Sequence, residues 1–255
     1  MTLPSRSALL IHGAFCGPWY FKDFAAALES EGWRTRSPAL PHHDTPSPGG
    51  VNGAVAGASL RDYLEDLLPA AADRPVVIGH SMGGVLALQL AALGHASAVV
   101  LLAPARPWGV PPTTQEEVAA AGMLMRLDRF WERAVPPSFE VAAATSLDRI
   151  PAERQRPVFD RLVPESGRAL FELLFWPMDH GSGAAVAWHR VRCPVLVLVG
   201  DQDKVTPASS VRGIAGLLPR AEFAVLPGLS HFIFGEPGEM AVTEAVRRWL
   251  AGLAG

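Results

Sequence analysis

The chain has 255 residues, of which 22 are basic, 25 are acidic and 49% are hydrophobic, so its formal net charge at pH 7 is −3. This near-neutral balance excludes the basic patch of a nucleic-acid-binding protein, and the apolar content excludes a disordered chain. No apolar run approaches the roughly 18–20 residues of a membrane span, the first residues lack the pattern of a secretory leader, and two cysteines, Cys16 and Cys193, are too few for a disulfide scaffold. We therefore expect a cytoplasmic globular protein with no integral membrane association.

Short apolar runs alternate with helical stretches along most of the chain. The apolar runs predict strands at Ala8–His12, Arg34–Ala39, Pro75–Gly79, Ala98–Ala103, Val195–Gly200 and Glu222–Leu226. Most of these runs are rich in Val, Leu and Ile without polar alternation, which is typical of strands buried on both faces. Helices are predicted at Trp19–Ser30, Ser59–Ala71, Met82–Leu93, Pro207–Leu217 and Ala241–Leu250. This alternation predicts an α/β fold with a mostly parallel sheet and helices on both faces.

The alternation stops between Arg106 and Arg192, where we predict no buried strand but several helical or irregular stretches with many large apolar residues. A segment this long is not a simple crossover. We therefore divide the chain into a first part of the core (1–105), an inserted helical cap (106–192) and a second part of the core (193–255). Most cap aromatics are expected to form the cap's own core, and a minority to line a substrate pocket. The candidates for that lining are Trp108, Phe175, Trp176 and Met178. The apolar surface of the cap could cover a homodimer interface or only the cap's own site, and the sequence does not decide between these alternatives.

The most specific motif is Gly79-His80-Ser81-Met82-Gly83, which ends one predicted strand and opens the predicted helix Met82–Leu93. A G-x-S-x-G sequence between a strand and a helix is a nucleophile elbow. The turn holds the serine in a strained backbone conformation, and the flanking glycines avoid clashes. The elbow lifts the Ser81 hydroxyl clear of the sheet and directs the helix N-terminus at the reacting centre. Ser81 is therefore the predicted nucleophile.

A serine nucleophile needs a base and an acid that orients the base. In an open α/β sheet the site gathers at the carboxyl ends of the strands, and with this elbow the chain order is Ser, then Asp or Glu, then His. Asp201 and Asp203 follow the predicted strand Val195–Gly200, and His231 lies on the loop after the last predicted strand. We predict Asp203 as the acid and His231 as the base, and we interpret Asp201 as a turn cap before the helix near Pro207.

The other histidines fit the role of the base less well. His12 and His80 stand beside glycines at strand ends, where we expect them to shape the loops, and His12 is also a candidate for lining the pocket. His42 and His43 resemble a metal cluster together with Asp44, but no further ligand set is apparent, so we interpret them as part of a surface or pocket-rim loop. The remaining histidines, expected in exposed or cap positions, are His95, His180 and His189.

A tetrahedral oxyanion needs two N–H donors. One is expected from Met82, the residue after the nucleophile, and the other from the loop after the first strand. Gly13 allows the backbone to approach the substrate closely, so the Ala14 N–H is the candidate and the Phe15 N–H is the alternative. The side chains of Phe15 and of Phe232, on the histidine loop, are further candidates for lining the pocket.

The chain resembles the α/β-hydrolase superfamily along nearly its whole length. The resemblance is carried by His12-Gly13, the Gly79–Gly84 elbow, Gly200-Asp201-Gln202-Asp203 and Gly228-Leu229-Ser230-His231. The sequence from His12 to Trp19 is similar to the oxyanion loop of the plant methylesterase and hydroxynitrile lyase group. The first strand also begins early, with no hairpin before it, which fits the six-stranded sheet of that group.

Departures from the pattern narrow the chemistry that the resemblance implies. The resembling plant lyases carry a Thr where this chain has Gly13, and a Lys directly after the histidine where this chain has Phe232. The cation that would stabilise departing cyanide is therefore missing. Epoxide hydrolases and haloalkane dehalogenases of this fold use an Asp nucleophile, whereas position 81 is Ser. The resemblance therefore implies an esterase rather than a lyase.

Together, the motifs and the resemblance predict a serine hydrolase similar to a carboxylesterase. Its substrate is expected to be a small ester, thioester or lactone with an apolar acyl or alcohol part, and the chemistry requires no metal and no organic cofactor. Two alternatives stay open. The same three residues serve an acyltransferase or cyclase that excludes water, and a receptor that binds a ligand without turnover also occurs on such folds.

Overall fold

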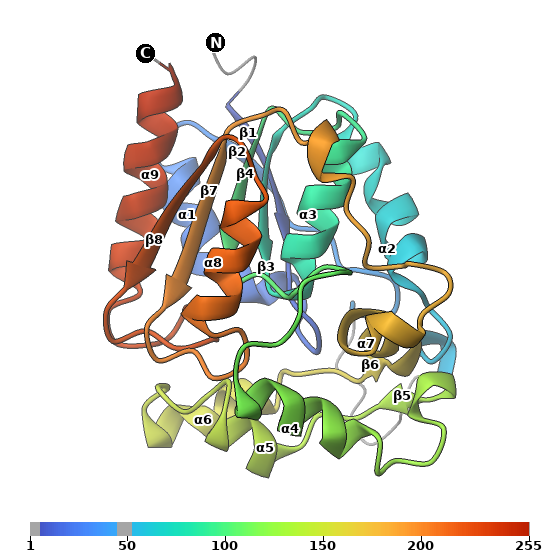
Figure 1. Ribbon diagram of the computed structural model, residues 1–255. Coiled ribbons are helices and arrows are strands. Elements are labelled where there is room, and N and C mark those ends of the chain that lie inside the picture. Colours follow the sequence, from blue (N-terminus) through green and yellow to red (C-terminus); the bar gives the residue numbers. More distant parts are fainter. Residues whose placement is uncertain (1–5, 45–52, 255) are drawn as a thin grey trace.

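The computed structural model describes residues 6–44 and 53–254, and Figure 1 shows their arrangement. Within them a six-stranded sheet has the order β2-β1-β3-β4-β7-β8, and every neighbouring pair is parallel. Its strands are β1 (Ser7–Ile11), β2 (Arg34–Arg36), β3 (Val76–His80), β4 (Ala98–Leu102), β7 (Val195–Gly200) and β8 (Ala221–Leu226). The predicted six-stranded α/β fold is therefore confirmed.

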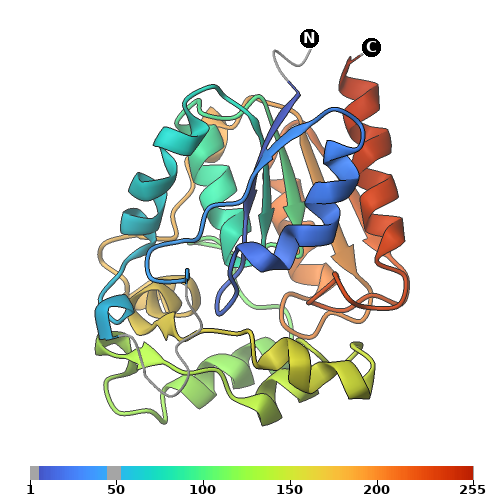
Figure 2. The same ribbon diagram turned by 180° about the vertical axis from the view of Figure 1, so that it is seen from behind.

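Helices cover both faces of this sheet. On one face lie α2 (Leu60–Leu67), α3 (Met82–Ala92) and α8 (Ala208–Gly216), as Figure 1 shows. On the other face lie α1 (Lys22–Glu29) and α9 (Met240–Ala254), which are nearer the viewer in Figure 2. No helix of the described residues is both long enough and apolar enough to span a membrane.

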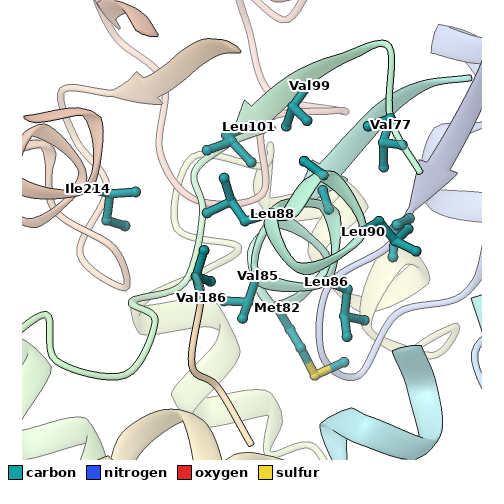
Figure 3. Close-up of a cluster of buried hydrophobic side chains, with 14 of the residues drawn as sticks. Val77, Met82, Val85, Leu86, Leu88, Leu90, Val99, Leu101, Val186 and Ile214 are labelled. Atoms are coloured by element: carbon teal, nitrogen blue, oxygen red, sulfur yellow. The ribbon is translucent and has the colours of Figure 1, made fainter. Parts of the chain in front are cut away.

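Two hydrophobic cores fill the spaces between the sheet and these helices. Val77 and Val99 face α3 in the first core (Figure 3), whereas their neighbours Ile78 and Val100 belong to the second core, under α1 and α9. Successive side chains of a strand point to opposite faces, so one uninterrupted apolar run supplies both cores. The strand runs lack polar alternation for this reason.

Some predicted boundaries are wrong for local reasons. The second strand ends at Arg36 instead of Ala39, just before Ser37 and Pro38, because proline has no N–H to donate to the sheet. The predicted helix Trp19–Ser30 divides into a 3-10 turn at Pro18–Phe21 and the helix α1. Further 3-10 turns lie at Gly53–Val55, Pro69–Ala71, Phe130–Glu132, Trp176–Met178 and Trp188–Arg190.

The segment 106–192 lies across the end of the sheet at which the strands finish (Figure 1). Its helices are α4 (Gln115–Leu124), α5 (Phe139–Ala144), α6 (Ala152–Phe159) and α7 (Gly167–Leu174). The prediction of no buried strand is wrong here, because β5 (Ala134–Val135) pairs antiparallel with β6 (Glu165–Ser166), and both residues of β6 are buried. Two-residue strands are too short to show periodicity. We propose that this segment is the cap of the site described next.

Candidate active site

Ser81 lies at the sharp turn between β3 and α3. Its backbone has φ +51° and ψ −118°, a left-handed conformation that a non-glycine residue seldom adopts. Gly83 permits this turn, because a Cβ at that position would collide with the backbone carbonyl of Ile11 on β1. Ser81 is partly exposed. Because it directly follows β3, it lies at the end of the sheet that faces segment 106–192 (Figure 1).

The structure brings Ser81 together with His231 and Asp203, the two residues that the sequence pairs with it. The Nε2 atom of His231 lies 3.1 Å from the Ser81 Oγ, and its Nδ1 lies 3.0 Å from the Asp203 Oδ2. Asp203 and His231 are buried, whereas Ser81 is half-buried. Since an ionised carboxylate only accepts hydrogen bonds, Nδ1 carries the proton in this arrangement and Nε2 is free to accept the Ser81 proton.

The Asp203 carboxylate is held by its own loop. Its Oδ1 accepts hydrogen bonds from the backbone N–H groups of Val205 and Thr206, both at 2.8 Å. The Thr206 hydroxyl donates to Oδ2 at 2.9 Å. These donors stabilise the ionised carboxylate and fix the direction in which it meets His231.

Asp201 makes a different hydrogen bond from the one that a turn cap before the helix near Pro207 would make. Its Oδ1 accepts a hydrogen bond from the Gly228 N–H at 2.7 Å, so it joins its own loop to the start of the loop that carries His231. The interpretation as a turn cap before Pro207 is therefore wrong. The two loops adjoin because β7 and β8 are neighbours in the sheet, and the sequence alone does not give that pairing.

His80 and Tyr20 hold the His231 loop by hydrogen bonds to its backbone carbonyls. The His80 Nε2–H donates to the His231 carbonyl at 2.9 Å, and the Tyr20 hydroxyl donates to the Phe232 carbonyl at 2.6 Å. The two aromatic rings stack with centroids 4.4 Å apart. Burial and the nearby His231 hold the pKa of His80 well below its ordinary value, so it is neutral. His80 thus shapes a loop, as its position beside a glycine suggests.

The loop after β1 lies directly against the nucleophile. A Cβ on Gly13 would lie 3.0 Å from the Ser81 Cβ and 2.8 Å from the His80 Nδ1, so a larger residue has no room. The N–H groups of Ala14 and Met82 donate to no acceptor within the described residues. The Phe15 N–H, in contrast, donates to the Glu165 carboxylate at 3.2 Å. Of the two predicted donors in this loop, only the Ala14 N–H is therefore unoccupied.

A buried ion pair between His43 and Glu165 adjoins this loop, since Glu165 accepts from the Phe15 N–H. The His43 Nε2 lies 3.0 Å from the Glu165 Oε2, and neither side chain has any solvent exposure. The interpretation of His43 as part of a surface or rim loop is therefore wrong. The pair joins residues 122 positions apart, and no local motif pairs His43 with Glu165.

Charge explains how this pair tolerates burial. Burial alone would lower the pKa of His43, but the Glu165 carboxylate beside it raises that pKa above its ordinary value. Burial alone would raise the pKa of Glu165, and the His43 charge together with hydrogen bonds lowers it. His12, 5.3 Å from His43 between ring centroids, stays neutral, since burial and the His43 charge lower its pKa to about 4.

The predicted pocket residues fall into different surroundings. Phe175 stacks on Phe171 with centroids 5.7 Å apart, in an aromatic cluster against which Ala14 and Phe15 also pack. Trp108 is 40% exposed, and its ring lies 5.1 Å from that of Trp176. That these residues line a pocket stays a prediction.

Two further predicted pocket residues, Phe232 and Met178, are not members of that cluster. Phe232 is buried, and its ring meets Tyr20 edge to face. Met178 is half exposed. A surface cavity of about 530 Å³ at the opposite end of the sheet, beside Gly94 and Cys193, contains none of the predicted site residues.

The parallel sheet, the elbow between β3 and α3 and the order Ser, Asp, His along the chain define an α/β enzyme fold with a serine at its elbow. The chain matches the Alpha/beta hydrolase family over residues 8–243 and belongs to that family.

Individual relatives extend this match. The chain is 28% identical over 229 residues to a monoacylglycerol lipase of Mycolicibacterium smegmatis, covering 83% of this chain and 76% of the relative. It is 29% identical over 251 residues to a pimeloyl-[acyl-carrier protein] methyl ester esterase of Aromatoleum aromaticum, covering 92% and 94%. In structure it is similar to the methylesterase protein MES16 from Arabidopsis, with a TM-score of 0.69, 16% identity and coverage of 96% and 98%.

Proposed function

We propose that this protein is a serine hydrolase that cleaves a carboxylic ester or a related thioester or lactone. The observation that carries the proposal is the unbroken line of hydrogen-bonding groups from Ser81 through His231 to Asp203, at 3.1 and 3.0 Å. Relatives named as a lipase and as a methyl ester esterase, each aligned over most of the chain, support it.

The proposed reaction has two halves. The Ser81 oxygen attacks the acyl carbon while its proton moves to the His231 Nε2, and the resulting oxyanion accepts hydrogen bonds from the Met82 and Ala14 N–H groups. The C–O bond to the alcohol breaks, and the alcohol leaves with the proton from His231. Water then gives one proton to His231 and attacks the acyl carbon of the acyl-enzyme. The bond between that carbon and the Ser81 oxygen breaks, the acid leaves, and His231 returns the proton to the Ser81 oxygen. Asp203 keeps the imidazole oriented throughout, and no step requires a metal or a cofactor.

The proposed substrate has an apolar part next to the reacting carbonyl. Ala14 and Phe15 pack against the buried apolar cluster of Phe130, Val135 and Leu170, as Phe171 and Phe175 also do, so apolar side chains adjoin the proposed oxyanion donors. The transfer of an apolar group from water to such a surface is favourable in free energy. The remaining predicted lining residues belong to the same proposal: Phe15, His12, Trp108, Trp176, Met178 and Phe232.

A fluorophosphonate probe tests the nucleophile. Wild-type protein should become covalently labelled on the tryptic peptide that contains Ser81, and it should hydrolyse para-nitrophenyl esters in a series of acyl chain lengths. Ser81→Ala should lose both the label and the hydrolysis, whereas Ser97→Ala, which changes a serine at the opposite end of the sheet, should keep both. A label that survives Ser81→Ala contradicts the proposal.

A further inference from the structure

The backbone of Phe15 is held on both sides by the segment that leads into β6. Its N–H donates to the Glu165 Oε2 at 3.2 Å, and its carbonyl accepts from the Val163 N–H at 2.9 Å. Phe15 has φ +63°, in the left-handed region that costs energy for a residue with a side chain. A conformation of this kind persists only where its surroundings impose it, and here they are two hydrogen bonds from segment 106–192.

The carboxylate that holds Phe15 is itself fixed. Besides Phe15, the Glu165 oxygens accept from the His43 Nε2 at 3.0 Å, the Tyr63 hydroxyl at 2.7 Å and the Ser166 N–H at 2.7 Å. These donors come from different parts of the chain, and the carboxylate has no solvent exposure.

His43 is suited to keep this carboxylate ionised. Its Nδ1 faces the Pro41 carbonyl at 2.9 Å, and its Nε2 faces Glu165, so both ring nitrogens have acceptors, as in a protonated imidazole. Every hydrogen-bonding group of the pair therefore has a partner of the matching kind. A buried ion pair is stable when its charges are matched and fully hydrogen-bonded in this way.

We propose that Glu165 is a positioning residue for the oxyanion hole: it fixes Phe15, and with it the adjacent Ala14 N–H, in the direction that the reaction needs. His43 holds the carboxylate in place. The inference rests on the proposed function, since an oxyanion hole has meaning only if Ser81 attacks an acyl carbon. Oxyanion stabilisation depends on donors that are oriented before the reaction begins, and the loss of one such donor costs about 10²–10³ in kcat.

The variant Glu165→Gln tests the proposal, and Glu172→Gln is its matched control. Glu172 is also a buried glutamate of segment 106–192, and its Oε2 accepts from a core N–H, that of Leu60, at 2.8 Å. That N–H opens α2, and within the described residues no hydrogen bond joins Glu172 to the loop after β1. An amide at position 165 has one acceptor oxygen where the carboxylate has two, so one of the two pairs of donors now meets an NH₂ group, and the loss of the negative charge also removes the ion pair with His43. The hold on the loop is therefore weakened. An amide at position 172 perturbs the same segment without touching Phe15.

With para-nitrophenyl butyrate as probe, Glu165→Gln should lower kcat about tenfold or more and leave KM within about twofold, because only the transition state has the oxyanion. Affinity for a short-chain alkyl trifluoromethyl ketone, which forms a tetrahedral oxyanion on Ser81, should fall by the same factor as kcat/KM. Glu172→Gln should change each quantity by less than about threefold. Equal effects in the two variants, or an effect confined to KM, overturn the proposal.

Two further measurements keep the result unambiguous. If Glu165→Gln does not fold, His43→Gln keeps an N–H donor toward the carboxylate without the positive charge, and it should give a smaller loss of kcat at unchanged KM; an unchanged kcat overturns the proposal. Fluorophosphonate labelling of the wild type separates the two claims. A wild type that takes no label overturns both, whereas a labelled wild type with equal effects at positions 165 and 172 overturns only the positioning role.

Discussion

At the scale of single residues, we expect one aspartate of the loop after β7, Asp203, to contribute to catalysis and the other, Asp201, to contribute to stability. Asp203 lies 3.0 Å from the His231 Nδ1 and is the proposed acid, whereas Asp201 joins the two loops by accepting from the Gly228 N–H. Asp203→Asn should lower kcat about 10⁴-fold, because the amide stabilises the wrong tautomer of the imidazole. Asp201→Asn should leave kcat within a few-fold and lower the free energy of unfolding by about 1 kcal/mol.

Steady-state kinetics and urea denaturation of the two variants check this expectation. Thermal unfolding of Asp203→Asn serves as the control for folding, since its carboxylate also accepts from Val205 and Thr206. Comparable kcat values for the two variants would contradict the assignment of the acid.

At the scale of elements, the contact between α3 and β1 depends on the absence of one side chain. A Cβ at Gly83 would collide with the Ile11 carbonyl, so Gly83→Ala should destabilise the fold by about 3 kcal/mol or more. Gly213→Ala, on the exposed side of α8, has open space around the new methyl and should stabilise by up to about 1 kcal/mol through helix propensity. Urea denaturation measures both changes. Equal effects would show that close packing at the elbow has no special importance.

Some parts of the candidate site can be predicted from the sequence and others cannot. The Ser81 elbow and the acid and histidine loops are predictable because each follows an apolar strand and has its own local pattern. The Glu165–His43 pair is not predictable in this way, since its partners are 122 positions apart and one lies on a two-residue strand. The task of Asp201 depends on the adjacency of β7 and β8. Side-chain partners that are set by tertiary packing leave no periodic signal in the chain.

At the scale of the whole molecule, stability should depend on a histidine buried without charge. The folded protein holds the pKa of His12 at about 4, below the ordinary 6.5. Between these pH values the unfolded chain binds a proton that the folded chain does not, so stability falls as the pH falls, by up to about 1.4 kcal/mol per pH unit. The folded state becomes protonated only near pH 4, where this contribution has been lost.

The variant His12→Asn tests the effect, because its amide keeps a donor for the Gly13 carbonyl, which His12 contacts at 2.9 Å, while the loss of the acceptor for the Leu40 N–H lowers stability equally at every pH. The difference in unfolding free energy between wild type and variant, measured by urea denaturation from pH 7 to pH 4.5, should shrink as the pH falls. Parallel curves would contradict the neutral, buried state of His12.

The lack of space at Gly13 also bears on how this chain could acquire a different reaction. The resembling plant lyases have Thr at this position and Lys after the histidine. Here a Cβ at Gly13 would lie 3.0 Å from the Ser81 Cβ. The residue after His231 is Phe232, which is buried against Tyr20. Two substitutions would therefore insert a branched side chain and a charged one into filled space. We therefore expect that this enzyme would acquire cyanohydrin cleavage only if the loop were rebuilt, and not through these two point mutations alone.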